Sequence, residues 1–348
     1  MSDPIEVGQC MIVQGDNMET LRLMPDNSVQ CVVTSPPYFG LRDYGVEGQL
    51  GLEKTPEQYV ATMVALFREV KRVLRDDGTL WLNLGDSYAN DGKWGGSTGG
   101  KHVSALHNSS VGRGKRDTGL KPKDLIGIPW RVAFALQADG WYLRQDIIWH
   151  KPNPMPESVR DRCTKAHEYI FMLSKRERYY YDADAIKTPP SETLLKQVAE
   201  GYDGKSTKNF AGGGAQDASG TKSRIIEGAR AKIDKQRGHS RRHAGFDARW
   251  DNLTREEQMS LGANKRDVWT VATKPFRGAH FATFPPELIE PCILAGSKPG
   301  DTVLDPFGGA ATVGLVCNRR KRNSIMLELN PEYVAISAER LMKEQSNG

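Results

Sequence analysis

The chain has 348 residues, enough for one large domain and a further module, and 38% of them are hydrophobic, which supports a real core. Its formal net charge of +5 at pH 7 is mild and by itself indicates only a solvated surface. No apolar run approaches the roughly 20 residues that span a membrane, and "MSDPIEVGQC" lacks the basic and apolar stretches of a secretory signal. The five cysteines are scattered without a CxxC pair, so we expect neither a disulfide framework nor a metal site, and a cytoplasmic location.

The N-terminal half predicts alternating strands and helices. "MIVQ" is a short strand, Gly15-Asp16 leads into a short helix around Leu21 and Leu23, and "VQCVV" is the next strand. Residues 56–74 carry apolar side chains at helical spacing behind a proline, and "DDGTLWLNLGD" then reads as a turn and a buried strand. A glycine-rich loop covers about 90–119, and "IPWRVAFALQADGWYLRQDIIWHKPN" indicates helix, turn and strand.

The C-terminal half continues the alternation after an interruption. "HEYIFMLSK" predicts a strand with "RYYYDADAI" as its hairpin partner, whereas residues 188–268 are poor in aliphatic side chains and resist assignment. "PPELIEPCILAG" predicts a helix, "DTVLDPFGGAATVGLVCNRR" a strand, glycine loop and helix, and "RNSIMLELNPEYVAISAERL" a strand, turn and helix. This alternation predicts an α/β, doubly wound, Rossmann-like sheet with an insertion.

Two strand ends carry unusual residues. The apolar pair Val32-Val33 leads straight into Ser35-Pro36-Pro37-Tyr38, where two prolines fix φ and remove two N–H donors, so the loop is stiff enough to hold a ligand. Near the other end, Val303-Leu304 leads into the segment "DPFGG" and a helix, and the next strand ends in Glu328, a position where a carboxylate can hold ribose hydroxyls. This second loop lacks the GxGxxG and P-loop patterns. Its acid, Asp305, disfavours a phosphate and favours a cationic ligand, which indicates S-adenosyl-L-methionine.

With these two motifs the chain resembles the amino-directed DNA methyltransferases, which modify the exocyclic amine of cytosine or adenine. The family hallmarks are an (Asp/Asn/Ser)-Pro-Pro-(Tyr/Phe) loop and an Asp-x-Phe-x-Gly loop, and the catalytic loop precedes the cofactor loop here, as in the family's β arrangement. The resemblance implies an S-adenosyl-L-methionine-dependent methyltransferase sheet with a target-recognition region between its halves. We therefore expect a catalytic half at 1–187, a target-recognition insertion at 188–268 and a cofactor-binding half at 269–348.

The resemblance also implies roles for single residues. Ser35 Oγ and the Pro36 carbonyl would accept hydrogen bonds from the target amine, Pro37 would hold the loop, and Tyr38 would stack on a base swung out of the duplex. If stacking is the whole role of Tyr38, Tyr38→Phe should be nearly silent. Residues expected at the cofactor are Asp16, Thr34, His280, Thr283, Phe284, Asp305, Pro306, Phe307, Gly308, Gly309, Thr312, Glu328 and Asn330. Residues expected at the DNA are Arg42, Trp149, Lys151, Arg241 and Arg242, although Trp149 could instead be a core aromatic and His280 a surface histidine.

Charge supports double-stranded DNA as the partner. Residues 90–125 hold seven Lys or Arg against three Asp or Glu, and residues 189–268 hold fifteen against eleven. A serine at the first position of the catalytic loop slightly favours cytosine N4 over adenine N6 as the target. A homodimer and a cognate restriction endonuclease are further partners that fit the family. Two competing interpretations stay open: methylation of RNA or another amine with the same loop, and a catalytically inactive DNA-binding protein on the same fold.

Overall fold

The computed structural model describes residues 3–41, 45–89, 118–190, 192, 262–274 and 283–347. Contacts divide the chain into two units, one formed by Met1–Ile186 with Arg266–Gly348 and the other by Lys187–Lys265. None of the helices within the described ranges is both long and apolar enough to cross a membrane.

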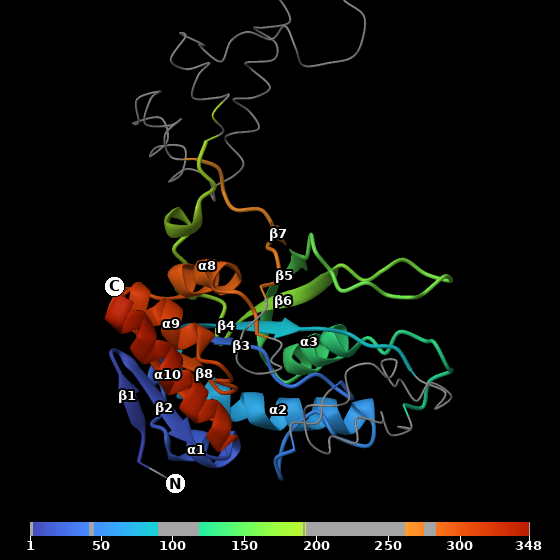
Figure 1. Cartoon of the computed structure of the whole chain (residues 1–348), viewed down its shortest axis with the longest axis horizontal. Coiled ribbons are helices and arrows are strands. Elements are labelled where there is room, and N and C mark those ends of the chain that lie inside the picture. Colours follow the sequence, from blue (N-terminus) through green and yellow to red (C-terminus); the bar gives the residue numbers. More distant parts are fainter. Residues whose placement is uncertain are drawn as a thin grey trace, which may run out of the picture. The chain divides into compact units, whose positions relative to one another are not determined.

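The described strands of the first unit form one nine-stranded sheet in the order β1-β2-β9-β8-β3-β4-β6-β5-β7 (Figure 1). The strands are β1 (Ile5–Val7), β2 (Cys10–Gln14), β3 (Val29–Thr34), β4 (Leu74–Leu84), β5 (Tyr142–His150), β6 (His167–Ser174), β7 (Val268–Thr270), β8 (Thr302–Asp305) and β9 (Asn323–Glu328). The centre, from β2 through β9, β8 and β3 to β4, is parallel, whereas β6 runs antiparallel to both β4 and β5. The predicted α/β, Rossmann-like fold is confirmed.

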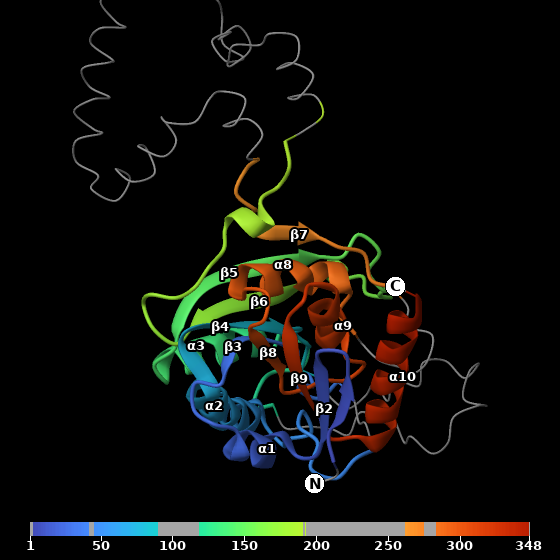
Figure 2. The same ribbon diagram turned by 90° about the vertical axis from the view of Figure 1, so that its left-hand side faces the viewer.

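Helices cover both faces of the sheet and bury two apolar clusters (Figure 2). The helices are α1 (Asn17–Leu23), α2 (Pro56–Val73), α3 (Ile128–Ala138), α8 (Pro286–Gly296), α9 (Thr312–Arg319) and α10 (Pro331–Asn347), with a 3₁₀ turn at η1 (Asp184–Ile186). Alternation along the strands explains the two clusters, because Cys31 and Val33 of β3 face α8 and α9 whereas Val32 faces α2 and α3.

Helix α2 shows how local sequence sets an element. Thr55 precedes it as the N-cap, and its side chain accepts the Gln58 N–H, while Pro56 occupies the first turn, where a missing N–H costs nothing. Lys71 and Arg72 lie in its last turn, where the helix dipole favours cations. The helix predicted at 56–74 is therefore confirmed with one residue fewer.

The predicted hairpin of "HEYIFMLSK" with "RYYYDADAI" is wrong. Strand β6 pairs on one side with β4 and on the other with β5, so neither edge is open to a third partner. Residues 179–182 run as irregular chain instead, with the Tyr180 N–H bonded to the Asp77 carbonyl and the Asp182 N–H to the Ala295 carbonyl. The short strand β1, which was not predicted, pairs with β2 at the sheet edge.

Candidate active site

The two unusual loops of the sequence leave neighbouring strands at the same edge of the sheet. Strands β3 and β8 pair in parallel, with Val32 opposite Leu304, so their carboxyl ends lie side by side. The chain order reverses between them, since β3 continues to β4 on one side and β8 to β9 on the other. Such a switch point leaves a crevice outside the strand ends, where open α/β sheets bind ligands.

A hydrogen bond joins the two loops directly. Thr34, the last residue of β3, donates its hydroxyl to Asp305 Oδ1 at 2.6 Å across 271 residues of sequence. The Phe307 N–H donates to the same oxygen at 3.0 Å, so Asp305 also orders its own loop. Both Thr34 and Asp305 are buried, so water does not compete for this hydrogen bond as it would at the surface.

A cavity opens at this edge, with about 990 Å³ of empty space when the part open to solvent is counted. Its lining includes many of the residues expected at the cofactor or in the catalytic loop: Asp16, Ser35, Pro37, Thr283, Phe284, Asp305, Pro306, Phe307, Gly308, Gly309, Thr312, Glu328 and Asn330. Thr34 and Pro36 are buried and are not among the lining residues, although Pro36 lies between Ser35 and Pro37, which are. Because Ser35 and the Asp-Pro-Phe-Gly-Gly loop line one cavity, a ligand on that loop would lie next to the Ser35 hydroxyl.

Glycines let the backbone of the Asp-Pro-Phe-Gly-Gly loop pack closely against strand β9. A Cβ on Gly308 would lie 3.1 Å from Met326 Cβ and 3.2 Å from the Leu327 carbonyl oxygen, so a side chain there would press on strand β9. Gly309 has φ +48°, in the left-handed region, and its N–H donates to Glu328 Oε2 at 2.7 Å. The loop therefore lies tightly against the end of β9 and brings Glu328 to the cavity.

Carboxylates are the only ionisable side chains among the described residues that line the cavity, apart from the Tyr333 phenol. Among its described lining residues are three carboxylates and no Lys, Arg or His. Burial raises the pKa of Asp305 to about 7; the hydrogen bonds from Thr34 and Phe307 lower that pKa, and the nearby Glu328 carboxylate raises it. Burial also raises the pKa of Glu328, against hydrogen bonds from the backbone of Asn330 and Gly309. A cationic ligand would therefore stabilise the ionised carboxylates, and a phosphate would destabilise them.

The Ser-Pro-Pro-Tyr loop is anchored from both sides. The Tyr59 hydroxyl of α2 donates to the Pro37 carbonyl at 2.9 Å. The ring of Tyr38 lies against β4 next to Gly85, where a Cβ would come within 2.5 Å of Tyr38 Cε2. These contacts hold the Ser-Pro-Pro-Tyr segment in one conformation.

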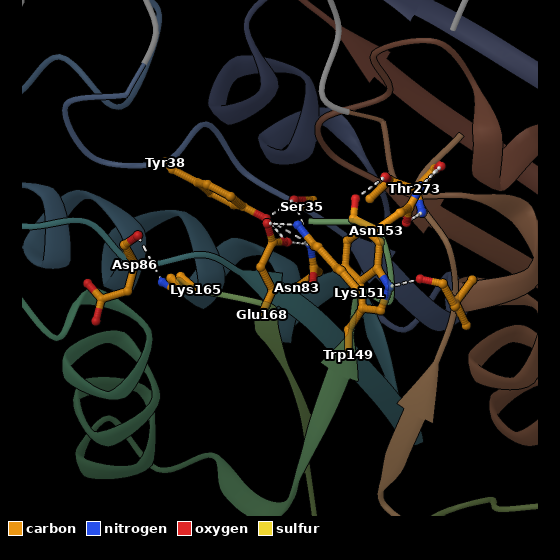
Figure 3. Close-up of polar contacts among 11 residues, drawn as sticks. Ser35, Tyr38, Asn83, Asp86, Trp149, Lys151, Asn153, Lys165, Glu168 and Thr273 are labelled. Atoms are coloured by element: carbon orange, nitrogen blue, oxygen red, sulfur yellow. Dashed lines mark hydrogen bonds and ion pairs between the residues drawn. The ribbon is translucent and has the colours of Figure 1, made fainter. Parts of the chain in front are cut away.

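A polar cluster, formed by Ser35, Tyr38, Asn83, Lys151 and Glu168, lies beside that loop (Figure 3). Tyr38 donates its hydroxyl to Glu168 Oε2 at 2.8 Å, and Lys151 Nζ pairs with Glu168 Oε1. Asn83 Nδ2 lies 2.8 Å from the Tyr38 hydroxyl oxygen, 3.2 Å from Glu168 Oε2 and 3.3 Å from Ser35 Oγ. The cluster therefore links the Ser-Pro-Pro-Tyr loop to β4, to β6 and to the residue that follows β5.

Sequence reasoning missed Asn83 and Glu168. Asn83 is the one polar side chain in "LWLNL", and Glu168 directly precedes the apolar run "YIFML" within strand β6. A polar residue that interrupts a buried strand needs a partner, and this signal could have found both.

The residues expected at the DNA are placed only in part. Trp149 is 3% exposed, donates its indole N–H to the Val271 carbonyl at 2.8 Å and lies in the core behind the polar cluster. The Lys151 ammonium lies 4.2 Å from the centroid of that ring and so connects it to Glu168. Arg42, His280, Arg241 and Arg242 lie outside the described residues, as do nearly all of the 90–119 loop and of 188–268.

Known proteins resemble the chain over nearly its whole length. It matches a family model described as DNA methylase, of the N6/N4 methyltransferases, over residues 29–339. It is 45% identical to the Type II methyltransferase M.Cfr9I of Citrobacter freundii over 99% of this chain and 92% of the relative. It is 42% identical to M.SmaI of Serratia marcescens over 97% of this chain and 92% of the relative.

Solved structures share the fold. The PvuII DNA methyltransferase, titled as cytosine-N4-specific, superposes with a TM-score of 0.56 at 18% identity, over 99% of this chain and 96% of that one. A DNA modification methylase of Thermus thermophilus, solved in complex with S-adenosyl-L-methionine, superposes with a TM-score of 0.51 at 21% identity, over 96% of this chain and 95% of that one.

Proposed function

Because the chain belongs to the N6/N4 DNA methylase family, we propose that it transfers a methyl group from S-adenosyl-L-methionine to the exocyclic amine of a base swung out of duplex DNA, with cytosine N4 as the target. The main support is that Ser35 and the Asp305 loop line one cavity, and that Thr34, the residue before Ser35, is hydrogen-bonded to Asp305. The proposed amine acceptor and the proposed cofactor loop are thus held at a fixed distance from each other, as in-line transfer requires.

The cavity fits this cofactor chemically. S-adenosyl-L-methionine supplies an electrophilic methyl group on a sulfonium and carries an ammonium and a ribose. Asp305 is buried and Glu328 is half-buried, and the pKa of each is raised mainly by burial, so a cation between them favours their charged forms. The loop at Phe307, Gly308 and Gly309 provides an apolar face and a close backbone beside them.

The catalytic loop acts on the amine. An exocyclic amine is a poor nucleophile because its lone pair is delocalised into the ring. Ser35 Oγ and the Pro36 carbonyl accept its two N–H groups and draw the nitrogen toward sp³ geometry, which localises the lone pair. The two prolines stiffen the loop, and the Tyr59 hydroxyl holds the adjacent Pro37 carbonyl, so the acceptors are preorganised before the base arrives.

Cytosine N4 is favoured over adenine N6 on two grounds. The first position of the loop is Ser35 rather than aspartate, and the PvuII enzyme, which shares the fold, is titled as cytosine-N4-specific. Methylation of RNA is disfavoured because the relatives are Type II DNA methyltransferases. Their Type II names also support a restriction-modification context with a cognate endonuclease, and a homodimer stays a further proposal.

Methyl incorporation tests the function. Full-length protein is incubated with S-adenosyl-L-methionine labelled on the methyl group and with genomic DNA of varied base composition, and the DNA is then digested to nucleosides. We expect label in N4-methylcytosine. Label in N6-methyladenine would overturn the target base alone. No label in any nucleoside, in protein that binds both DNA and cofactor, would favour the inactive DNA-binding alternative.

A further inference from the structure

The polar cluster forms a directional chain of hydroxyl groups that ends on a carboxylate. Ser35 Oγ donates to the Tyr38 hydroxyl oxygen at 3.4 Å, and Tyr38 in turn donates to Glu168 Oε2 at 2.8 Å. Ser35 also lines the cavity, and Asn83 Nδ2 takes one lone pair of Ser35 Oγ, so the other lone pair remains available to an amine. Figure 3 shows this arrangement, with Glu168 between Tyr38 and Lys151.

We propose that Glu168 is the final acceptor of the proton that the target amine loses, and that the hydroxyls of Ser35 and Tyr38 carry that proton to it. This inference rests on the proposed methyl transfer and extends it to a residue that the sequence motifs do not include. Tyr38 then has a chemical role through its hydroxyl in addition to any stacking of its ring.

Atoms and charge balance in this step. The amine nitrogen forms a bond to the methyl carbon while the carbon–sulfur bond breaks, and its electron pair stays on sulfur as a neutral thioether. The nitrogen gains positive charge and releases one N–H proton to Ser35 Oγ. Ser35 passes its own proton to the Tyr38 oxygen, Tyr38 passes its proton to Glu168 Oε2, and the neutral carboxyl remains paired with Lys151.

The local electrostatics support transfer in this direction. Positive charge moves from the cofactor toward the amine, and therefore toward the Glu168 carboxylate. The exocyclic ammonium that methylation forms is strongly acidic, because loss of a proton returns the nitrogen lone pair to conjugation with the ring, so a carboxylate is a sufficient base. Burial, followed by the neighbouring Glu168 charge, raises the pKa of Tyr38 well above its usual value, so the phenol stays neutral and conducts a proton without being ionised. The Glu168 side chain keeps 15% of its surface exposed, which lets the proton leave to water afterwards.

Asn83 and Lys151 position the chain. The Asn83 amide donates toward both the Tyr38 oxygen and Ser35 Oγ, which leaves their protons directed along the chain to Glu168. Lys151 holds the other carboxylate oxygen and is itself held over the Trp149 ring. The buried Trp149 ring thus helps to position Lys151, and through it Glu168.

The competing view is that Glu168 and Lys151 only fix the loop. Single-turnover methyl transfer separates the two views, with the substitutions Tyr38→Phe and Glu168→Gln. Both keep the shape of the side chain, and either breaks the proton path. Matched controls are Tyr169→Phe, which removes a phenol hydroxyl one residue away among aromatic rings, and Glu157→Gln, which removes a carboxylate paired with Arg162 in the loop before β6.

We expect both site variants to slow the chemical step by about 10²-fold, in the range of general acid–base catalysis, and both controls to stay near the wild-type rate. Cofactor affinity and the fluorescence of a base analogue at the target position should be unchanged, because neither binding nor base flipping uses the proton path. A Tyr38→Phe rate within twofold of wild type would overturn the proposal. That variant decides the question even if Glu168→Gln fails to fold. Failure of the proposed function is distinguishable, because wild type itself would then transfer no methyl group.

Discussion

The Asp305 carboxylate is buried at the end of β8 and bonded to Thr34, and burial raises its pKa to about 7. In the unfolded chain the same group has a pKa near 3.8, so the folded, cofactor-free protein holds the proton more tightly. Ionising Asp305 therefore opposes folding, and its contribution to the free energy of unfolding falls as the pH rises from about 3.8 to about 7.

The first prediction concerns binding at this residue. The affinity for S-adenosyl-L-methionine should rise as the pH increases through about 7, because the ionised carboxylate attracts the cation and the protonated form does not. Asp305→Asn should bind more weakly at high pH and lose most of this dependence. Titration calorimetry of both proteins across this range measures the effect. Equal pH dependence in wild type and variant would show that another group is responsible.

The second prediction concerns Ser35, which lines the cavity beside the cofactor loop. Ser35→Ala should lower the single-turnover rate by about 10²–10³-fold, the cost of one contact that acts in the transition state, and leave cofactor affinity nearly unchanged. The Pro36 carbonyl remains as an acceptor, so some activity should survive. A wild-type rate in Ser35→Ala would leave the backbone carbonyl as the essential acceptor.

At the scale of elements, helix α8 packs very closely on the sheet. A Cβ on Gly296 would lie 2.6 Å from Cys31 Sγ of β3 and 2.7 Å from Thr79 Oγ1 of β4. Gly296→Ala should therefore lower the free energy of unfolding by about 1–3 kcal/mol through overpacking. Thr62→Ala, on the exposed face of α2, is the control and should change stability little. Chemical denaturation measures both, and an unchanged midpoint for Gly296→Ala would contradict this packing.

The same scale shows what sequence can and cannot predict. Helix α2 was predictable because its N-cap, its first-turn proline and its apolar spacing all indicate a helix that begins at the same residue. The loops after β3 and β8 were predictable because prolines and glycines restrict or widen the backbone conformations of the residues themselves. The hairpin at "RYYYDADAI" failed because pairing depends on which sheet edges are free, and β4 and β5 had already filled both edges of β6. The contact of Glu168 with Tyr38 spans 130 residues, and only the sheet order brings them together.

At the scale of the molecule, the unit Lys187–Lys265 begins and ends at one place. Thr188 and Ala263 form an antiparallel bridge, with reciprocal N–H to carbonyl bonds of 2.8 and 2.9 Å. We expect that replacing 191–261 with a short Gly-Ser linker preserves the fold and cofactor affinity and abolishes sequence-specific DNA binding. Calorimetry and a DNA-binding assay on matched and scrambled duplexes test this. Retained discrimination between duplexes would move target recognition elsewhere in the chain.

The bond between Thr34 and Asp305 joins the Ser-Pro-Pro-Tyr loop, which we propose holds the base, to the Asp-Pro-Phe-Gly-Gly loop, which we propose binds the cofactor. A change of charge or position at Asp305 therefore reaches the residue just before Ser35 through one hydroxyl group. By thermodynamic linkage such coupling is reciprocal. If bound cofactor raises the affinity for an extrahelical base by some factor, that base must raise the affinity for the cofactor by the same factor. The protein would then assemble its ternary complex cooperatively, whichever ligand arrives first.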